Sequence, residues 1–375
     1  MFTRYMPLQI FVRLLLILFI SGVLPQDLLG IIRILVSMGW FQLDEYNKAL
    51  RDFKYSTKEA SNKPQQVVGQ LRIKKLSGKA TSHWLHIRIF PYILYVNKWI
   101  KQKQDMVFQL ALQLNEITAY ITADKIQEHE ITILEAVIES YLDNRNSVYE
   151  KFPDLLGRPK PKHHYLVHYP EAIRNFGPPS SFWTGRYESK HRISKSISES
   201  SKNFINITHT VSFRHQFRMC SVYYNGMFDE SFYTLPTKVV KKDDLTDSDL
   251  DRELKPFLSS KADLLCSEIV YKCRKYVAGD VVVINRNDLL TLEVGVVKAI
   301  HVGKRGVSLI VRRYRAEMIG QLPLFLCSKV RQDFMSNNLV SVSMKDLSDT
   351  YPIMKRGTED QFLIILHHHV SFKYE

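Results

Sequence analysis

Residues 104–123 read QDMVFQLALQLNEITAYITA, and they set the helical character of the first half of the chain. Apolar side chains recur there at intervals of one, three or four residues, at Val107, Leu110, Ala111, Leu114, Ile117 and Ile121. This spacing places them on one face of an α-helix. Residues 128–151 keep a similar spacing, with Glu135 and Glu139 facing outward. The two stretches predict a pair of long amphipathic helices.

The pattern changes after residue 278. Short runs rich in Val, Ile and Leu follow, separated by glycines and polar turns, and the first of them is Asp280 to Ile284. Closely spaced short strands of this kind predict a small β-barrel, SH3-like or similar, over residues 278–375. The stretch 237–277 contains clustered charges of both signs with Ser and Pro, which predicts a linker.

The expected fold class is therefore α+β, with a mainly helical domain over residues 22–236 before the linker and the small barrel. A chain of 375 residues with 45% apolar residues can hold two such domains. Its four cysteines are too few for a disulfide framework and predict ordinary buried thiols in a reducing compartment. The sequence shows no phosphate-binding loop, dinucleotide-binding glycine pattern or serine-hydrolase elbow.

The charge of the chain favours a polyanionic partner. Lysine and arginine number 52 against 38 acidic residues, which gives a net charge of +14. Residues 151–220 alone hold twelve of these cations and four acids. DNA is the first partner that such an excess suggests, an anionic membrane is the second, and a basic but otherwise ordinary soluble protein is the plain alternative.

Residues 1–21 form an apolar N-terminal segment with two open interpretations. The run Ile10 to Ile20, interrupted by Arg13 and followed by Ser21-Gly22, resembles a short signal peptide. It also fits a buried helix that begins the fold. The first interpretation predicts a secreted or membrane-attached protein, whereas the basic interior favours a nuclear one.

The most distinctive stretch of the chain lies between residues 162 and 192. It contains KHHYLVHYP at 162–170, FGP at 176–178 and FWTGRYESKHR at 182–192. This block resembles animal relatives of the CACTA (En/Spm) transposases, and the segment 22–30 and Asn62-Lys63-Pro64 fit the same family. The resemblance covers most of the chain from about residue 22 and identifies it as the C-terminal portion of a transposase-derived protein.

The resemblance implies the remnant of an RNase H-like nuclease core with its helical insertion. In that core three carboxylates hold two Mg²⁺ ions for attack on a phosphodiester. Glu188 matches the third carboxylate, with a simple ion pair to Arg186 or Arg192 as the alternative. The residues expected to contact nucleic acid are Arg186, Lys190, His191, Arg192, Lys195 and Lys162.

The first two catalytic aspartates of the family are not recognisable in this sequence. The place of the second is filled by Phe11 to Ser21, which contains no acid, and Asp27, Asp44 and Glu45 follow it. One carboxylate cannot hold a two-metal site, so we expect a nucleic-acid-binding protein with an incomplete, inactive DDE-type centre. An active nuclease would need carboxylates from a longer isoform or a partner chain.

A second feature that the wider group implies is structural zinc. In relatives that include the V(D)J recombinase, a histidine pair shortly before the catalytic glutamate binds zinc with a Cys-x2-Cys pair. His164 and His168 have the spacing that brings two imidazoles to one helix face. No cysteine precedes Cys220, so His83 and His86 would have to complete the site. Packing or phosphate contact is the alternative role, and the barrel could bind chromatin or protein.

Overall fold

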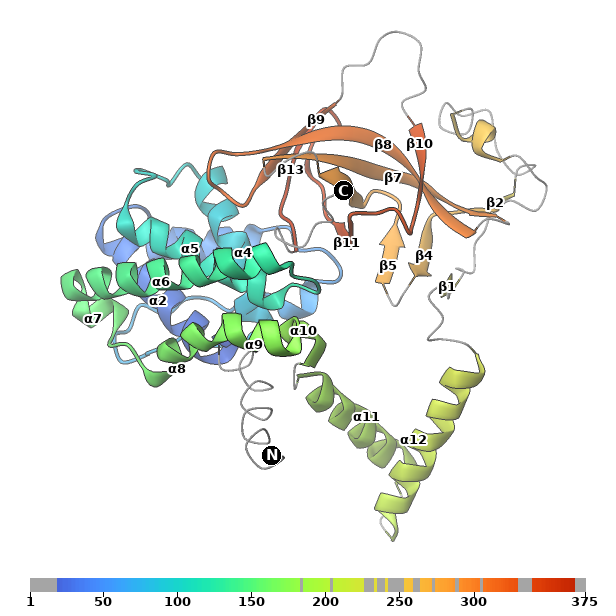
Figure 1. Cartoon of the computed structure of the whole chain (residues 1–375), viewed down its shortest axis with the longest axis horizontal. Helices are drawn as coiled ribbons and strands as arrows, with labels where there is room; N and C mark the ends of the chain where they lie inside the picture. Colours follow the sequence, from blue (N-terminus) through green and yellow to red (C-terminus); the bar gives the residue numbers. More distant parts are fainter. Residues whose placement is uncertain are drawn as a thin grey trace. The chain divides into compact units, whose positions relative to one another are not determined.

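The computed structural model describes residues 19–182, 185–202, 205–225, 233–234, 240–241, 253–258, 264–271, 274–286, 290–303, 306–329 and 339–367. The fold is α+β, as expected from the change of periodicity along the chain (Figure 1). Two compact units can be distinguished. The first comprises Met1–Tyr187 with Ile365–Ser371, and the second comprises Glu188–Ile364 with Phe372–Glu375.

The first unit is helical. Its longer helices are α2 (Leu24–Ser37), α3 (Leu43–Asp52), α4 (Ala80–Val96), α5 (Met106–Thr122) and α6 (Glu128–Lys151). Shorter elements are η1 (Phe19–Val23), η2 (Ala60–Asn62), α7 (Pro153–Leu156), α8 (Pro161–His164), η3 (Tyr165–His168), α9 (Tyr169–Phe176) and α10 (Pro179–Phe182). The helices predicted at 104–123 and 128–151 are confirmed as α5 and α6.

Helix α2 lies at the centre of this unit, and every residue from Leu24 to Leu35 is buried. Such a helix can pack on several sides only if its neighbours approach closely. A Cβ atom on Gly30 would lie 2.7 Å from Leu156 Cδ1 and 2.9 Å from the Leu156 Cα atom. The glycine therefore allows α7 to contact α2 at backbone distance.

Helix α4 runs through the aromatic and β-branched residues that follow Ala80, with Pro91 inside it. Of the apolar segment 1–21, residues 1–18 lie outside the described residues, and Phe19 and Ile20 are buried. The helical run Phe19–Ser37 has the length and composition to cross a membrane, and 83% of an apolar 18-residue window within it is buried. It therefore also fits the core helix of a soluble domain.

The second unit contains two helices and the sheets. The helices are α11 (Gly185–Ser201), whose first three residues belong to the first unit, and α12 (Ile207–Tyr224), and a 3-10 turn spans Lys255–Phe257. The strands are β1 (Tyr233–Thr234), β2 (Val240–Lys241), β3 (Leu264–Cys266), β4 (Glu268–Tyr271), β5 (Arg274–Val277), β6 (Val281–Arg286), β7 (Thr291–Gly303), β8 (Gly306–Met318), β9 (Phe325–Lys329), β10 (Leu339–Ser343), β11 (Asp349–Ile353), β12 (Arg356–Gly357) and β13 (Gln361–Ile364).

The long antiparallel hairpin of β7 and β8 organises the larger sheet. Its order is β11-β6-β7-β8-β9-β13-β12, with β10 also paired to β8 and β3 to β7. The other sheet has the order β1-β4-β5. The described strands do not close into a barrel. They also start earlier than the sequence suggested, since β2 to β5 fall within 237–277, the stretch predicted as a linker. In that stretch β3 extends the larger sheet by pairing Leu264 with Val302.

Candidate functional site

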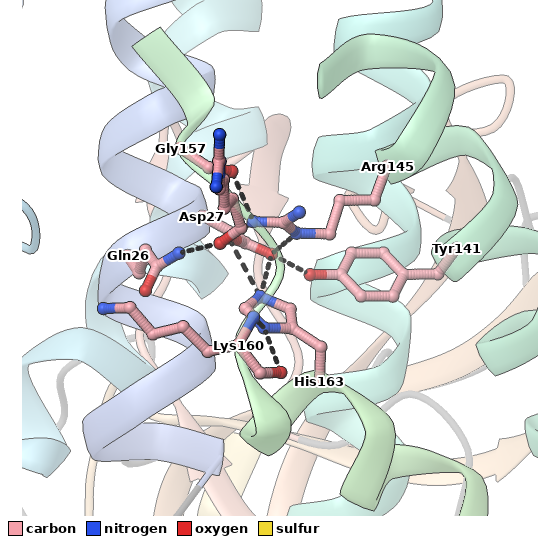
Figure 2. A network of polar contacts seen from close by, with 8 residues as sticks. Gln26, Asp27, Tyr141, Arg145, Gly157, Lys160 and His163 are labelled. Atoms are coloured by element: carbon pink, nitrogen blue, oxygen red, sulfur yellow. Dashed lines mark hydrogen bonds and ion pairs between the residues drawn. The ribbon is translucent and has the colours of Figure 1, made fainter. Parts of the chain in front are cut away.

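Asp27 on α2 is the centre of a buried polar network (Figure 2). Arg145 on α6 donates to it twice, from Nε to Oδ2 at 2.8 Å and from Nη2 to Oδ1 at 3.0 Å. The Tyr141 hydroxyl also donates to Oδ2. His163 on α8 places Nε2 at 3.0 Å from the same oxygen. Helix α2 thus meets α6 and α8, which lie far from it in the sequence, at one carboxylate.

Local geometry explains how the partners reach Asp27. Tyr141 and Arg145 are four residues apart on α6, so both side chains project from the same face. His163 is fixed at the start of α8, where its Nδ1 atom accepts from the Lys160 N–H at 2.9 Å. The same Nδ1 atom lies 3.2 Å from the Lys160 carbonyl oxygen, to which a protonated ring can donate, and in either form the Nε2 atom faces Asp27. Arg145 also donates to the Gly157 carbonyl at 3.2 Å, and this bond links the turn after α7 to α6.

The network keeps Asp27 ionised although its side chain is fully buried. Burial alone would raise the pKa of this carboxyl, but the hydrogen bonds and charges of His163 and Arg145 outweigh it and lower the pKa to about 2. For Arg145, burial acts to lower the pKa, and the bond and charge of Asp27 raise it overall. A carboxylate that accepts bonds from three side chains inside the core has no oxygen free for a metal. Asp27 is therefore a structural residue and not a substitute catalytic carboxylate.

The same network determines where the neighbouring residues of the 162–192 block lie. Because His163 points inward from α8, its neighbours Lys162 and His164 are exposed. The Lys162 side chain crosses Gly22, where an added Cβ atom would lie 2.7 Å from Lys162 Cδ. Gly22 thus leaves room for the lysine stem on the surface of the helical unit.

His164 and His168 lie together as their spacing predicted. Their ring centroids are 5.2 Å apart, and both residues are exposed. However, the part of the chain that the structure describes holds no group of three or more His, Cys, Asp or Glu side chains suited to a metal ion. A zinc site formed by this pair therefore has no third described ligand.

His83 and His86, the proposed substitutes for the missing cysteines, are engaged inside the helical unit. His86 Nε2 lies 2.7 Å from the Tyr46 hydroxyl, and His83 Nδ1 lies 3.3 Å from the Ile20 carbonyl. Burial lowers the pKa of His86 to about 3, with the nearby His83 as a second cause. Both histidines act as neutral core side chains.

Apart from Lys162 on α8, the expected catalytic and DNA-contacting residues lie on α11. Glu188, Arg186 and Lys190 belong to this helix, and their side chains lie outside the described residues. His191, Arg192 and Lys195 are described and exposed. Lys195 Nζ is 3.9 Å from Glu199 Oε1, a solvent-exposed pair that neutralises little. By contrast, Arg174 on α9 contacts both Glu128 and Glu135, so its charge is balanced within the helical unit.

Helix α12 carries a second set of exposed groups that the motif did not include. None of its residues from Ile207 to Tyr224 is buried. Arg214 and Arg218 are exposed on it, and Arg214 Nη1 donates to Ser200 Oγ on α11 at 3.2 Å. Phe213 and Phe217 are also exposed, with 61% and 72% of their surface accessible. Cys220 is exposed too, contrary to the prediction that all cysteines are buried.

The sequence alone predicted neither the Asp27 network nor the exposed aromatic residues of α12. The Tyr141–Arg145 pair and the Phe213–Phe217 pair both have the i, i+4 spacing of one helix face, so each was visible as a local pattern. Their different surroundings were not visible, since one pair is buried and the other is in solvent. No family model, curated protein or solved structure matches the chain.

Proposed function

We propose that this chain is a transposase-derived, CACTA-like nuclear protein that binds nucleic acid and has an incomplete DDE-type catalytic centre. The observation that carries the proposal is the exposed, positively charged surface of α11 and α12. In the finer fold assignment, the helical unit is the remnant of an RNase H-like core with its helical insertion. The sheet unit is a relative of the small SH3-like barrels.

The charge of α11 and α12 is not balanced by their own acids. Residues 191–225 contain five lysines and arginines against Glu199 as the one acid, a net of four positive charges. The described cations of this segment, such as Arg192, Arg214 and Arg218, are exposed. Phosphates of a nucleic acid would release counterions on binding such a surface, and this release drives association at low salt.

Among the residues that the structure describes, the carboxylates near the expected place of the second aspartate do not form a two-metal site. Asp27 is enclosed by Arg145, Tyr141 and His163. Glu45 caps its own helix by accepting from the Gln42 N–H at 3.2 Å, and Asp44 is exposed beside it. Two metal ions at close range need several carboxylates to offset their mutual repulsion. Glu188 by itself supplies one negative charge among several cations.

The binding proposal is tested with the full chain and a labelled duplex of about 20 base pairs. With six to eight phosphate contacts, affinity should fall on the order of a thousandfold between 50 and 200 mM salt. The triple variant Arg186→Ala, Lys190→Ala, Arg192→Ala should flatten this dependence. Binding that ignores salt, or that the triple variant leaves unchanged, would refute the nucleic-acid function.

The catalytic part is tested separately by nicking of supercoiled plasmid with Mg²⁺ or Mn²⁺. We expect no metal-dependent nicking by the purified chain, and Glu188→Gln is the matched variant. Nicking that requires metal and disappears in Glu188→Gln would show an active centre and overturn this part of the proposal, while DNA binding could still hold.

A further inference from the structure

Helix α12 presents one face that is aromatic and uncharged. His209, Phe213, Phe217, Cys220 and Tyr224 follow one another at intervals of three and four residues, so they share this face. Phe213 is 61% exposed, Phe217 72% and Tyr224 92%. The rings of His209 and Phe213 are nearly parallel, at 12° with their centroids 6.2 Å apart. The face is thus a row of flat side chains open to solvent.

This face is not covered by packing within the part of the chain that the structure describes. A helix gains most of its stability in a protein by burying one face, and α12 buries none of its residues. Its more shielded side, with Val211, His215 and Met219, is half-buried and lies away from the aromatic row. Phe213, Phe217 and Tyr224 are therefore available to a ligand.

The charges beside the row indicate which ligand fits. Arg214 and Arg218 each follow one of the phenylalanines by a single residue, so positive charge runs along one flank of the row. A ligand that contacts both the aromatic row and the arginine flank must have flat apolar faces and regularly spaced negative charge. Unpaired bases on a phosphate backbone supply these two properties together.

We propose that α12 binds single-stranded nucleic acid, with bases stacked on Phe213, Phe217 and Tyr224 and phosphates held by Arg214 and Arg218. This inference rests on the proposed nucleic-acid function and names its preferred substrate. A duplex would use only the arginines, because the faces of paired bases are covered by their neighbours in the stack. A second copy of the chain would bring two cationic flanks together, which disfavours it as the occupant.

The test compares binding of a 20-nucleotide oligo(dT) and a duplex of the same length to the full chain. Base stacking contributes roughly a tenfold affinity per ring, so Phe213→Leu/Phe217→Leu should weaken oligo(dT) binding by about 100-fold. Duplex binding should change less than about twofold. Leucine keeps the helix and the apolar surface, and Tyr95→Leu, an exposed aromatic of α4, is the matched control without effect.

Two further measurements separate this inference from the function on which it rests. Arg214→Gln/Arg218→Gln should weaken the binding of both oligo(dT) and duplex. It should also lower the slope of log K against log salt for both ligands, by about 2 for the duplex. Oligo(dT) should also slow alkylation of Cys220, which lies in the aromatic row and is read by mass spectrometry of its peptide.

The outcomes are distinct. If both ligands bind but the double leucine variant affects them equally, the stacking inference is wrong and the nucleic-acid function stands. If neither ligand binds, the stacking inference and the nucleic-acid function are both wrong. If light scattering shows a dimer that the leucine variant dissociates, with no preference for oligo(dT), the row is a contact between copies and the inference is overturned.

Discussion

The Asp27 network and the α12 row place similar side chains in opposite environments. Around Asp27, the charges of the carboxylate and Arg145 are buried and each has its counter-charge within 3.0 Å. On α12, Arg214 and Arg218 stand in solvent beside exposed phenylalanines. Tyr141 and Arg145 share one face of α6 through their four-residue spacing, whereas Arg214 and Arg218 each follow a phenylalanine by one residue and flank the aromatic face of α12.

This contrast separates residues required for folding from residues available for binding. Removing a member of the first group leaves a buried charge without its partner, which costs stability. Removing a member of the second changes only solvent-exposed surface, so folding should hardly be affected. Any large effect of substituting these exposed residues must therefore appear in ligand affinity and not in stability.

The largest expected effect is that of Asp27→Asn. The variant removes the negative charge that compensates Arg145 inside the core, and such a loss typically lowers the free energy of unfolding by about 3–5 kcal/mol. Urea denaturation measures it. Asp44→Asn, an exposed carboxylate of the same kind, should change stability by less than about 0.5 kcal/mol. Equal effects of the two variants would contradict the structural role of the network.

The next effect concerns acid stability. His86 is neutral in the folded protein because burial lowers its pKa to about 3, whereas in the unfolded chain it takes up a proton below about pH 6.5. The free energy of unfolding should therefore fall as the pH falls from 6.5 towards 3, by roughly 3 kcal/mol at pH 4 from this residue. His86→Gln should flatten that part of the curve, and an unchanged pH slope would refute the assignment.

A smaller effect is expected at Gly30, where α2 meets α7. The added methyl group of Gly30→Ala would overlap Leu156, including its backbone Cα atom at 2.9 Å. Overpacking of this kind costs about 1–3 kcal/mol, which exceeds the gain in helix propensity of about 1 kcal/mol. Thermal unfolding would show a lower midpoint. A stabilised variant would mean that α7 can move away from α2 without loss.

The smallest effect on stability belongs to the α12 row. Because Phe213 and Phe217 are exposed, Phe213→Leu/Phe217→Leu should change the free energy of unfolding by less than about 0.5 kcal/mol. Circular dichroism at 222 nm during urea titration gives the value. A loss of several kcal/mol would mean that these rings are packed in the folded protein, and the contrast with Asp27 would disappear.

Part of this structure could be predicted from local pattern alone. The apolar spacing in 104–123 and 128–151 predicted α5 and α6, and the change of pattern near residue 278 indicated the α+β class. The clustered charges of 237–277 predict a linker, whereas the short strand β3 in that stretch depends on pairing with the distant end of β7. Long-range pairing of that kind leaves little trace in a local window.

The candidate site was predictable only in part, for the same reason. His164 and His168 were expected together, and four-residue spacing was enough to bring them together. The sequence indicates no partner for Asp27, because His163 and Arg145 lie more than a hundred residues away in the chain. The exposure of Phe213 and Phe217 likewise depends on what the rest of the fold leaves uncovered.

The most direct test of the central claim is a charge-matched comparison of DNA binding against salt concentration. One variant, Arg192→Gln/Arg214→Gln/Arg218→Gln, removes three cations from α11 and α12. The control, Lys54→Gln/Lys74→Gln/Lys103→Gln, removes three exposed cations from the helical unit and leaves the same net charge. We expect the first variant to lower the slope of log K against log salt by about 3 and the control to leave it unchanged. Equal slopes for the two variants would contradict the claim that α11 and α12 form the binding surface.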